Sequence, residues 1–304
     1  MVITPPGFQP MLLHVGASIG WTSFTVHWST VAGLLCLAGL YEWRARTADM
    51  GHGTWDVGAP KSDRAHLPSP ISHLRRSLFY AGLVVIFLSL NGWLHDLSDY
   101  YLFSAHMVQH LLLTMLVPPL LIAGTPGWML RPLLHTPLVG RAARYLTRPG
   151  VCFVTFNVVL ASWHLPPMYN TAMAHHSIHI LQHLMFMAAA VMLWWPILSP
   201  LPELPRLSYP LQMLYLFLTS IPMSIVAVYI TYGGTLLYPS YAAAPRIAGL
   251  TPLEDQLLGG LIMWIPGGLV LFAVISVIFF KWQARGAEDT AASAQVDWSP
   301  AAGG

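Results

Sequence analysis

Two copies of the pattern His-x-x-Gln-His lie within apolar runs of the sequence, at residues 106–110 and 179–183. Histidines four residues apart lie one above the other on the same face of a helix. Each copy therefore presents two imidazoles to one side, and neutral imidazole is the commonest metal ligand in proteins. Because ionisable residues inside membrane segments are usually functional, the two copies predict a metal site.

The composition indicates an integral membrane protein. Of 304 residues, 55% are hydrophobic and 9% are charged, with a mean hydropathy of +0.58. A helix needs roughly 20 apolar residues to cross the hydrocarbon core. We predict an all-α polytopic membrane bundle of seven transmembrane helices, with a kink at Pro118-Pro119 near the inner end of the third. The predicted spans are 22–43, 75–95, 103–123, 149–165, 175–196, 208–232 and 254–281.

The distribution of lysine and arginine predicts the orientation, because loops rich in these residues stay cytoplasmic. Thirteen of the fourteen fall on one side of the predicted spans, and Arg246 falls on the other. The N-terminus is therefore expected outside and the C-terminus inside. This topology divides the chain into an outer N-terminal segment (1–21), a membrane domain (22–282) and a flexible cytoplasmic tail (283–304).

The topology places ten of the fourteen histidines on the outer side or in the outer half of the membrane. At 1.5 Å per residue, His110 and His183 each lie roughly 10–13 Å below the start of their helices, which permits both to face one site. The alternative is that outer histidines lie among the headgroups or form hydrogen bonds between helices. The predicted metal ligands are His106, His110, His164, His179, His183 and Met107, with Asp255 and His176 as supporting residues.

Copper is the metal that we expect at this site. Imidazoles suit copper and zinc, whereas thioethers select Cu(I). Met107, Met168 and Met173 lie near the outer histidines in the sequence, where no cysteine is available. The alternative for each methionine is ordinary filling of an irregular apolar core.

Other functional classes find little support in the sequence. Nucleophile elbows, phosphate-binding glycine loops, H-E-x-x-H and paired catalytic carboxylates do not stand out, so we expect no enzyme activity. The net charge of +2 is small, and the topology accounts for the basic residues, so nucleic acid is not an expected partner.

Gly259-Gly260 and Gly267-Gly268 indicate close packing of the last span. The outer loop at 233–252 is long enough to fold over the mouth of the bundle.

Several motifs together resemble the multi-span CtaG family of bacterial cytochrome c oxidase assembly factors. The resemblance covers most of residues 20–280. It rests on SAHMVQHLLL at 104–113, PPLLIAGTP at 118–126, WHLP at 163–166, HILQH at 179–183, WWP at 194–196, LYP at 237–239, PLEDQ at 252–256 and LGGLIMW at 258–264.

The resemblance implies a seven-span accessory protein of the bacterial cytoplasmic (inner) membrane that is needed to form active haem-copper oxidase. Its implied role is to help copper reach the oxidase from a periplasm-facing site. The implied partners are the subunits of haem-copper cytochrome c oxidase, a periplasmic copper donor and membrane lipid. The loop at 47–74 and the tail follow no recognised family pattern, so their roles stay open.

Two other functions remain open from the sequence. Facing imidazoles on different helices could ligate a b-type haem in an electron-transfer protein. Against this, each His-x-x-x-His pair lies on one side of its helix, whereas the two axial ligands of one haem need opposite sides. Alternatively, the chain is a metal-free accessory or scaffold subunit of the oxidase, with histidines that form hydrogen bonds between helices.

Overall fold

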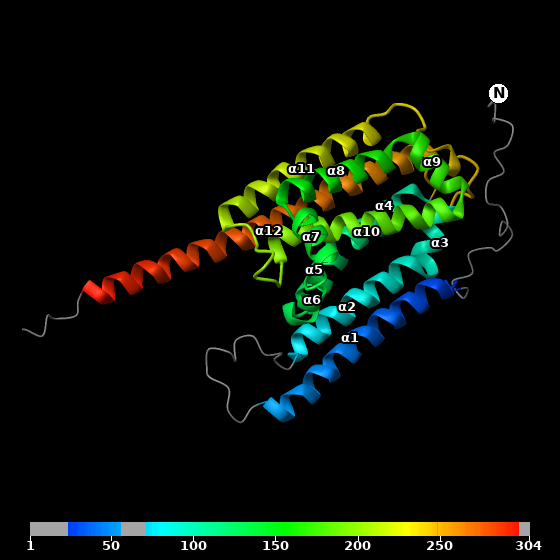
Figure 1. Ribbon diagram of the computed structural model, residues 1–304. Coiled ribbons are helices and arrows are strands. Elements are labelled where there is room, and N and C mark those ends of the chain that lie inside the picture. Colours follow the sequence, from blue (N-terminus) through cyan, green and yellow to red (C-terminus); the bar gives the residue numbers. More distant parts are fainter. Residues whose placement is uncertain (1–23, 56–70, 248, 298–304) are drawn as a thin grey trace, which may run out of the picture.

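A computed structural model describes residues 24–55, 71–247 and 249–297, and the chain is helical without β-strands in these residues. The expected all-α class is therefore confirmed. Most of the long segments lie alongside one another in a bundle (Figure 1). They are α1 (Trp28–Trp55), α2 (His73–Leu90), α4 (Phe103–Leu111) with η3 (Leu112–Leu116) and α5 (Val117–Gly124), α8 (Pro149–His164), α10 (His176–Leu198), α11 (Tyr209–Thr231) and α12 (Pro252–Asp297). The short helices are α3 (Gly92–Tyr100), α6 (Gly127–Leu134), α7 (Pro137–Leu146), α9 (Pro166–Ala174) and η4 (Pro239–Tyr241).

The structure supports a multi-pass membrane protein. Among the described residues, five segments are long and apolar enough to cross a bilayer, and α8 with α9 forms a sixth if this bent pair is one span. The five are His73–Leu90, Phe103–Gly124, His176–Leu198, Tyr209–Thr231 and Pro252–Glu288. The first predicted span, 22–43, overlaps α1, which is not among these segments. Seven spans therefore stay a prediction, and so does the orientation.

The bend between α8 and α9 follows from the sequence. The two helices meet at an angle of 71°. Between them lies Leu165, with an extended backbone (φ −67°, ψ 134°). Proline disfavours helical conformation in the residue before it, so Pro166 ends α8 and begins α9. As a result, His164 is the last residue of α8.

A π-helix, η3, lies one turn before Pro118-Pro119, while Phe103–Gly124 counts as a single span, so the kink at these prolines stays a prediction. Pro118 has no N–H to donate to the carbonyl of Thr114, four residues before it. The Trp194 indole N–H of α10 donates to that carbonyl at 2.9 Å. Short π-helices of this kind often accompany functional sites, and this one begins two residues after His110.

The two ends of the bundle differ in charge. At one end, Arg131 of α6 pairs with Glu203 at 2.6 Å, and the Arg285 guanidinium lies 5.1 Å from the Tyr209 ring. We call this end, formed by α6, α7 and residues 199–208, the basic end. The opposite end, which we call the histidine end, consists of α3, α9 and residues 232–251 (Figure 1). Of the described lysines and arginines, only Arg246 lies at the histidine end, which is the segregation that the sequence predicted.

The segments predicted outside the membrane domain lie only partly within the described residues. Residues 1–21 lie outside the described residues, as do 56–70 of the loop at 47–74. The predicted tail boundary at 283 falls inside α12, which continues to Asp297. Residues 298–304 lie outside the described residues.

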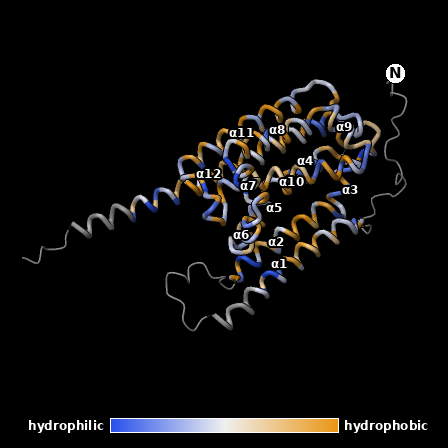
Figure 2. Tube along the Cα trace, viewed as in Figure 1, coloured by the Kyte–Doolittle hydropathy of each residue, from blue (hydrophilic) through white to orange (hydrophobic). Residues whose placement is uncertain are grey.

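The core lies between α4, α8, α10, α11 and α12, where large side chains such as Phe156, Phe186 and Trp194 are fully buried. Apolar residues also cover much of the outside of the bundle (Figure 2), as expected of helices that face lipid. A Cβ on Gly260 would lie 2.3 Å from Thr231 Oγ1, so the predicted close packing is confirmed there. It is wrong for Gly268, which has open space around it.

Candidate metal centre

The first histidine pair lies on α4. His106 and His110 are one helical turn apart, and their ring centroids are separated by 4.2 Å. Both residues are buried, at 0% and 6% exposure. None of their four ring nitrogens has a hydrogen-bond partner among the described residues. A buried polar atom without a partner costs about 1–3 kcal/mol, so these rings are candidates to bind something else.

The second pair, on α10, faces the first. His183 Nε2 lies 3.0 Å from His179 Nε2. The ring centroids of His106 and His179 are 5.6 Å apart, and those of His110 and His183 are 5.4 Å apart. The structure thus brings the two His-x-x-Gln-His copies together at matching depth, as predicted from their positions in the helices.

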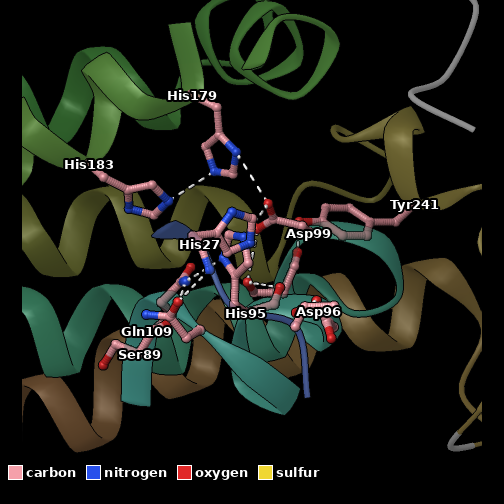
Figure 3. Close-up of polar contacts among 12 residues, drawn as sticks. His27, Ser89, His95, Asp96, Asp99, Gln109, His179, His183 and Tyr241 are labelled. Carbon is pink, nitrogen blue, oxygen red and sulfur yellow. Dashed lines mark hydrogen bonds and ion pairs between the residues drawn. The ribbon is translucent and has the colours of Figure 1, made fainter. Parts of the chain in front are cut away.

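A carboxylate completes the outer part of this cluster. Asp99 of α3 places Oδ2 3.4 Å from His179 Nδ1 and 3.5 Å from His95 Nε2. Figure 3 shows His179 between His183 and Asp99, with contacts to both. Candidate ligand atoms of Asp99, His106 and His179 all lie within 4.8 Å of one another. We call Asp99, His106, His179 and His183 the outer cluster.

Sequence reasoning did not select Asp99 as a site residue. The signal was present, because His95 and Asp99 have the i, i+4 spacing that places two side chains together on a helix. The Ser98 hydroxyl lies 2.7 Å from the carbonyl oxygen of His95 and 3.0 Å from Asp99 Oδ1, and its single proton is shared between these two acceptors. What the sequence lacked was the position of α3, a short helix between two spans, relative to α10.

His164 joins the cluster from α8. Its ring centroid lies 5.9 Å from that of His110. Its Nδ1 lies 2.7 Å from the carbonyl oxygen of Leu160, which has only acceptor capacity, so Nδ1 carries the proton and donates it. The Nε2 lone pair then has no partner among the described residues. Metal-binding histidines typically donate the other ring N–H in this way, which fixes the tautomer and the ring orientation.

The other predicted site residues have different positions. Asp255 is buried, and its carboxylate accepts hydrogen bonds from Phe103 N at 2.7 Å, Ser104 N at 3.1 Å and Ser104 Oγ at 2.5 Å. These contacts hold the first turn of α4, three residues before His106, and none of the described hydrogen bonds of Asp255 reaches an imidazole. His176 is exposed at the start of α10. Met107 is 1% exposed beside His110, whereas Met168 is 47% exposed.

Tyrosine hydroxyls join the loop after α11 to α3, α8 and α9. Tyr241 donates a hydrogen bond to the carbonyl of Ser98 at 2.7 Å, and its hydroxyl lies 2.8 Å from that of Tyr169. Tyr238 donates to the carbonyl of His164 at 2.8 Å. Burial raises the pKa of the Tyr241 phenol well above its ordinary value, so the hydroxyl stays protonated as a donor. The predicted folding of this loop over the mouth of the bundle is therefore confirmed.

Comparison with known proteins shows that the sequence of this chain matches a family. The family model described as cytochrome c oxidase caa3 assembly factor (Caa3_CtaG) matches residues 57–285, about three quarters of the chain. Two similar curated proteins are uncharacterized protein Mb0105 of Mycobacterium bovis and uncharacterized protein MT0111 of Mycobacterium tuberculosis, each 26% identical over 205 residues. The matches cover 60% of this chain but 30% of each relative, so the chain spans less than a third of their length. No solved structure matches the chain significantly.

Proposed function

We propose a function from the premise that the chain belongs to the cytochrome c oxidase caa3 assembly factor family. Membership connects the chain with assembly of the oxidase, and the helices support a multi-pass membrane protein. Our proposal is that the chain aids delivery of copper to a haem-copper oxidase. In this proposal copper is cargo that the chain binds and releases, and the chain performs no catalysis.

One observation carries the proposal. The outer cluster gathers three imidazoles and one carboxylate, with candidate ligand atoms of Asp99, His106 and His179 within 4.8 Å of one another. Both ring nitrogens of His106 and one of His183 lack hydrogen-bond partners among the described residues. A bound metal ion would accept the lone pair of one nitrogen of each ring and so offset part of the cost of burying them. Imidazole is a common ligand of copper.

The proposed orientation directs the histidine end, with this buried cluster, toward the periplasm. The segregation of lysine and arginine to the basic end favours that end in the cytoplasm, which directs the histidine end outward from a bacterial inner membrane. With α1 as a further span and α8 with α9 as one, the chain would cross seven times. Copper would then arrive from a periplasmic donor and leave to an oxidase subunit in the same membrane.

The rival functions are less well supported. A haem requires space for a macrocycle between its axial ligands, whereas the histidine rings are closely packed with one another and with Phe186 and Tyr169. A metal-free scaffold would leave several buried ring nitrogens unpaired at a free-energy cost. The scaffold function would be favoured if the histidine variants described next left the copper content of the oxidase unchanged.

The test compares variants of the chain in cells that need it for oxidase assembly. A deletion strain would be complemented with the wild type, His106→Ala, His179→Ala or the control His135→Ala, which changes an exposed histidine near the basic end. We expect the first two variants to reach the membrane at wild-type levels while the copper content and activity of the purified oxidase fall together. The control should retain both. Normal oxidase copper in the His106 and His179 variants would overturn the proposal.

A further inference from the structure

A small cavity of about 20 Å³ lies on the inner side of the outer cluster, between α4, η3, α8, α10, α11 and α12. Four thioethers and two imidazoles contribute to its wall: Met107, Met115, Met223, Met263, His110 and His164. We call these six residues the inner pocket. A space of this size can hold one water molecule or one ion.

Two imidazoles of the inner pocket have free lone pairs. His164 donates Nδ1–H to Leu160, which leaves Nε2 without a partner, and neither nitrogen of His110 has a partner among the described residues. The two residues are 3% and 6% exposed. Their rings are 5.9 Å apart and nearly perpendicular, at 88°. One ion could therefore accept electron pairs from both rings.

The methionines come from three separate parts of the chain and are all buried, at 1–5% exposure. Met107 and Met115 lie on α4 and η3, Met223 on α11 and Met263 on α12. A single buried methionine usually fills space. Four thioethers around one cavity, together with two imidazoles that each have an unpartnered nitrogen, match the ligand set that selects Cu(I).

The charge of the surroundings also distinguishes the inner pocket from the outer cluster. The outer cluster contains the carboxylate of Asp99, whereas the residues that line the cavity carry no acidic side chain. Burying an ion without a compensating charge is costly, and the cost grows with the charge of the ion. A monovalent ion therefore suits the inner pocket better than a divalent one.

We infer that the inner pocket is a second metal site, which binds one soft monovalent cation, Cu(I), through the imidazoles of His110 and His164 and methionine thioethers. The inference rests on the proposed function in one respect, that the cation is the same cargo. His110 also links the two sites, because its ring centroid lies 4.2 Å from that of His106 and 5.4 Å from that of His183. Passage between the sites exchanges ligands on Cu(I) without any change in oxidation state.

The experiment is a Cu(I) titration of the purified full chain in detergent, under ascorbate and without oxygen, followed by X-ray absorption at the copper edge. The test variant is Met223→Leu/Met263→Leu, because leucine conserves the volume and the burial of methionine. The matched control is Met129→Leu/Met168→Leu, which removes two thioethers outside the inner pocket.

We expect the wild type and the control to bind two Cu(I) per chain with sulfur among the ligands. The Met223/Met263 variant should bind the second Cu(I) more weakly and with fewer sulfur ligands, and Zn(II) should occupy only the outer cluster. A wild type without sulfur ligands, or a test variant that binds both ions with unchanged affinity and an unchanged sulfur signal, would overturn the inference.

The result of the Cu(I) titration can be distinguished from the result of the complementation test of the proposed function. If sulfur ligation is absent but oxidase copper still depends on His179, the inner pocket is refuted and delivery stands. If the pocket binds Cu(I) through sulfur but oxidase copper is normal in the His106 and His179 variants, delivery is refuted and the second site stands.

Discussion

Asp99 Oδ2 lies 3.4 Å from His179 Nδ1, which joins the short helix α3 to the long helix α10 at the histidine end. An imidazole that donates Nδ1–H to a carboxylate keeps its lone pair on Nε2. In His179 this Nε2 faces His183 Nε2 at 3.0 Å. In this tautomer His183 Nε2–H donates to the His179 lone pair, so the lone pair of His183 lies on Nδ1, which has no partner among the described residues. The contact gives Asp99 a role as an orienting group, a ligand, or both.

Replacing Asp99 with asparagine tests this relationship. The change keeps the size of the side chain but removes its negative charge. We expect copper to bind the outer cluster roughly 10–100-fold more weakly, the usual effect of losing a partner of a ligating histidine. Competition with a copper chelator measures the affinity. Asp96→Asn is the control, because that carboxylate accepts from Thr25 Oγ1 in an exposed position. Equal losses in the two variants would refute a specific role for Asp99.

Asp255 is predicted to stabilise α4 without binding copper. Asp255→Ala would leave two buried backbone N–H groups and the Ser104 hydroxyl without their acceptor. We expect a loss of about 2 kcal/mol in the free energy of unfolding, from loss of a helix cap and of buried hydrogen bonds. Helix content followed during thermal unfolding in detergent measures it. The exposed neighbour Glu254→Ala should cost less. Copper loss without destabilisation would make Asp255 a ligand.

Gly260 and Gly268 of α12 allow the packing of this helix to be tested, because one is closely packed and the other is not. A Cβ at position 260 would meet Thr231 Oγ1 at 2.3 Å and Thr231 N at 2.9 Å, whereas one at position 268 would meet nothing within 4 Å. We expect Gly260→Ala to destabilise the chain by about 1–3 kcal/mol, because α11 and α12 must move apart. Gly268→Ala should be neutral or slightly stabilising, because alanine favours the helix. Thermal unfolding of both variants in the same detergent provides the measurement. Similar stabilities would contradict the packing of α11 on α12.

The loop at the histidine end is predicted to open at high pH. Burial raises the folded-state pKa of Tyr241 well above 10.0, the ordinary value that applies when the loop is open. The closed loop therefore retains a proton that the open loop loses. This contribution to stability is fully present below pH 10 and decreases as the pH rises above 10.

Hydrogen exchange of residues 232–251, corrected for intrinsic rates, measures this opening. Protection should stay constant from about pH 7 to 9 and decrease above pH 10. Tyr241→Phe should lower protection at pH 7 by about 1 kcal/mol, through loss of the hydrogen bond to Ser98, and should weaken the alkaline decrease. Unchanged exchange in this variant would show that the hydroxyl does not hold the loop.

Much of the fold could be predicted from the sequence. Long apolar runs located α8, α10 and α11 within two residues and α2 within five, because the bilayer length and flanking prolines restrict where such helices begin and end. The start of α12 was also located, but this helix continues beyond the predicted end at 281 to Asp297. The convergence of His106, His110, His179 and His183 followed from their spacing and depth. These predictions depend on local geometry, which a single helix determines by itself.

The rest of the site depends on contacts between distant segments. Asp99 reaches His179 only because α3 folds back toward α10, and Asp255 caps α4 from a helix about 150 residues away in the sequence. Of the six residues of the inner pocket, the sequence selected Met107, His110 and His164 but not the other three. Met115, Met223 and Met263 are ordinary apolar residues in their own helices, and only the packing of η3, α11 and α12 brings them to one cavity.

The most direct test of copper binding is metal analysis with an optical spectrum on the detergent-purified chain, beside His110→Ala, His183→Ala and the control His135→Ala. We predict copper in the wild type and the control, a lower copper content in both test variants, and no haem Soret band. Equal copper in all four proteins would contradict the assigned site. A Soret band that disappears in the test variants would contradict copper as the cargo.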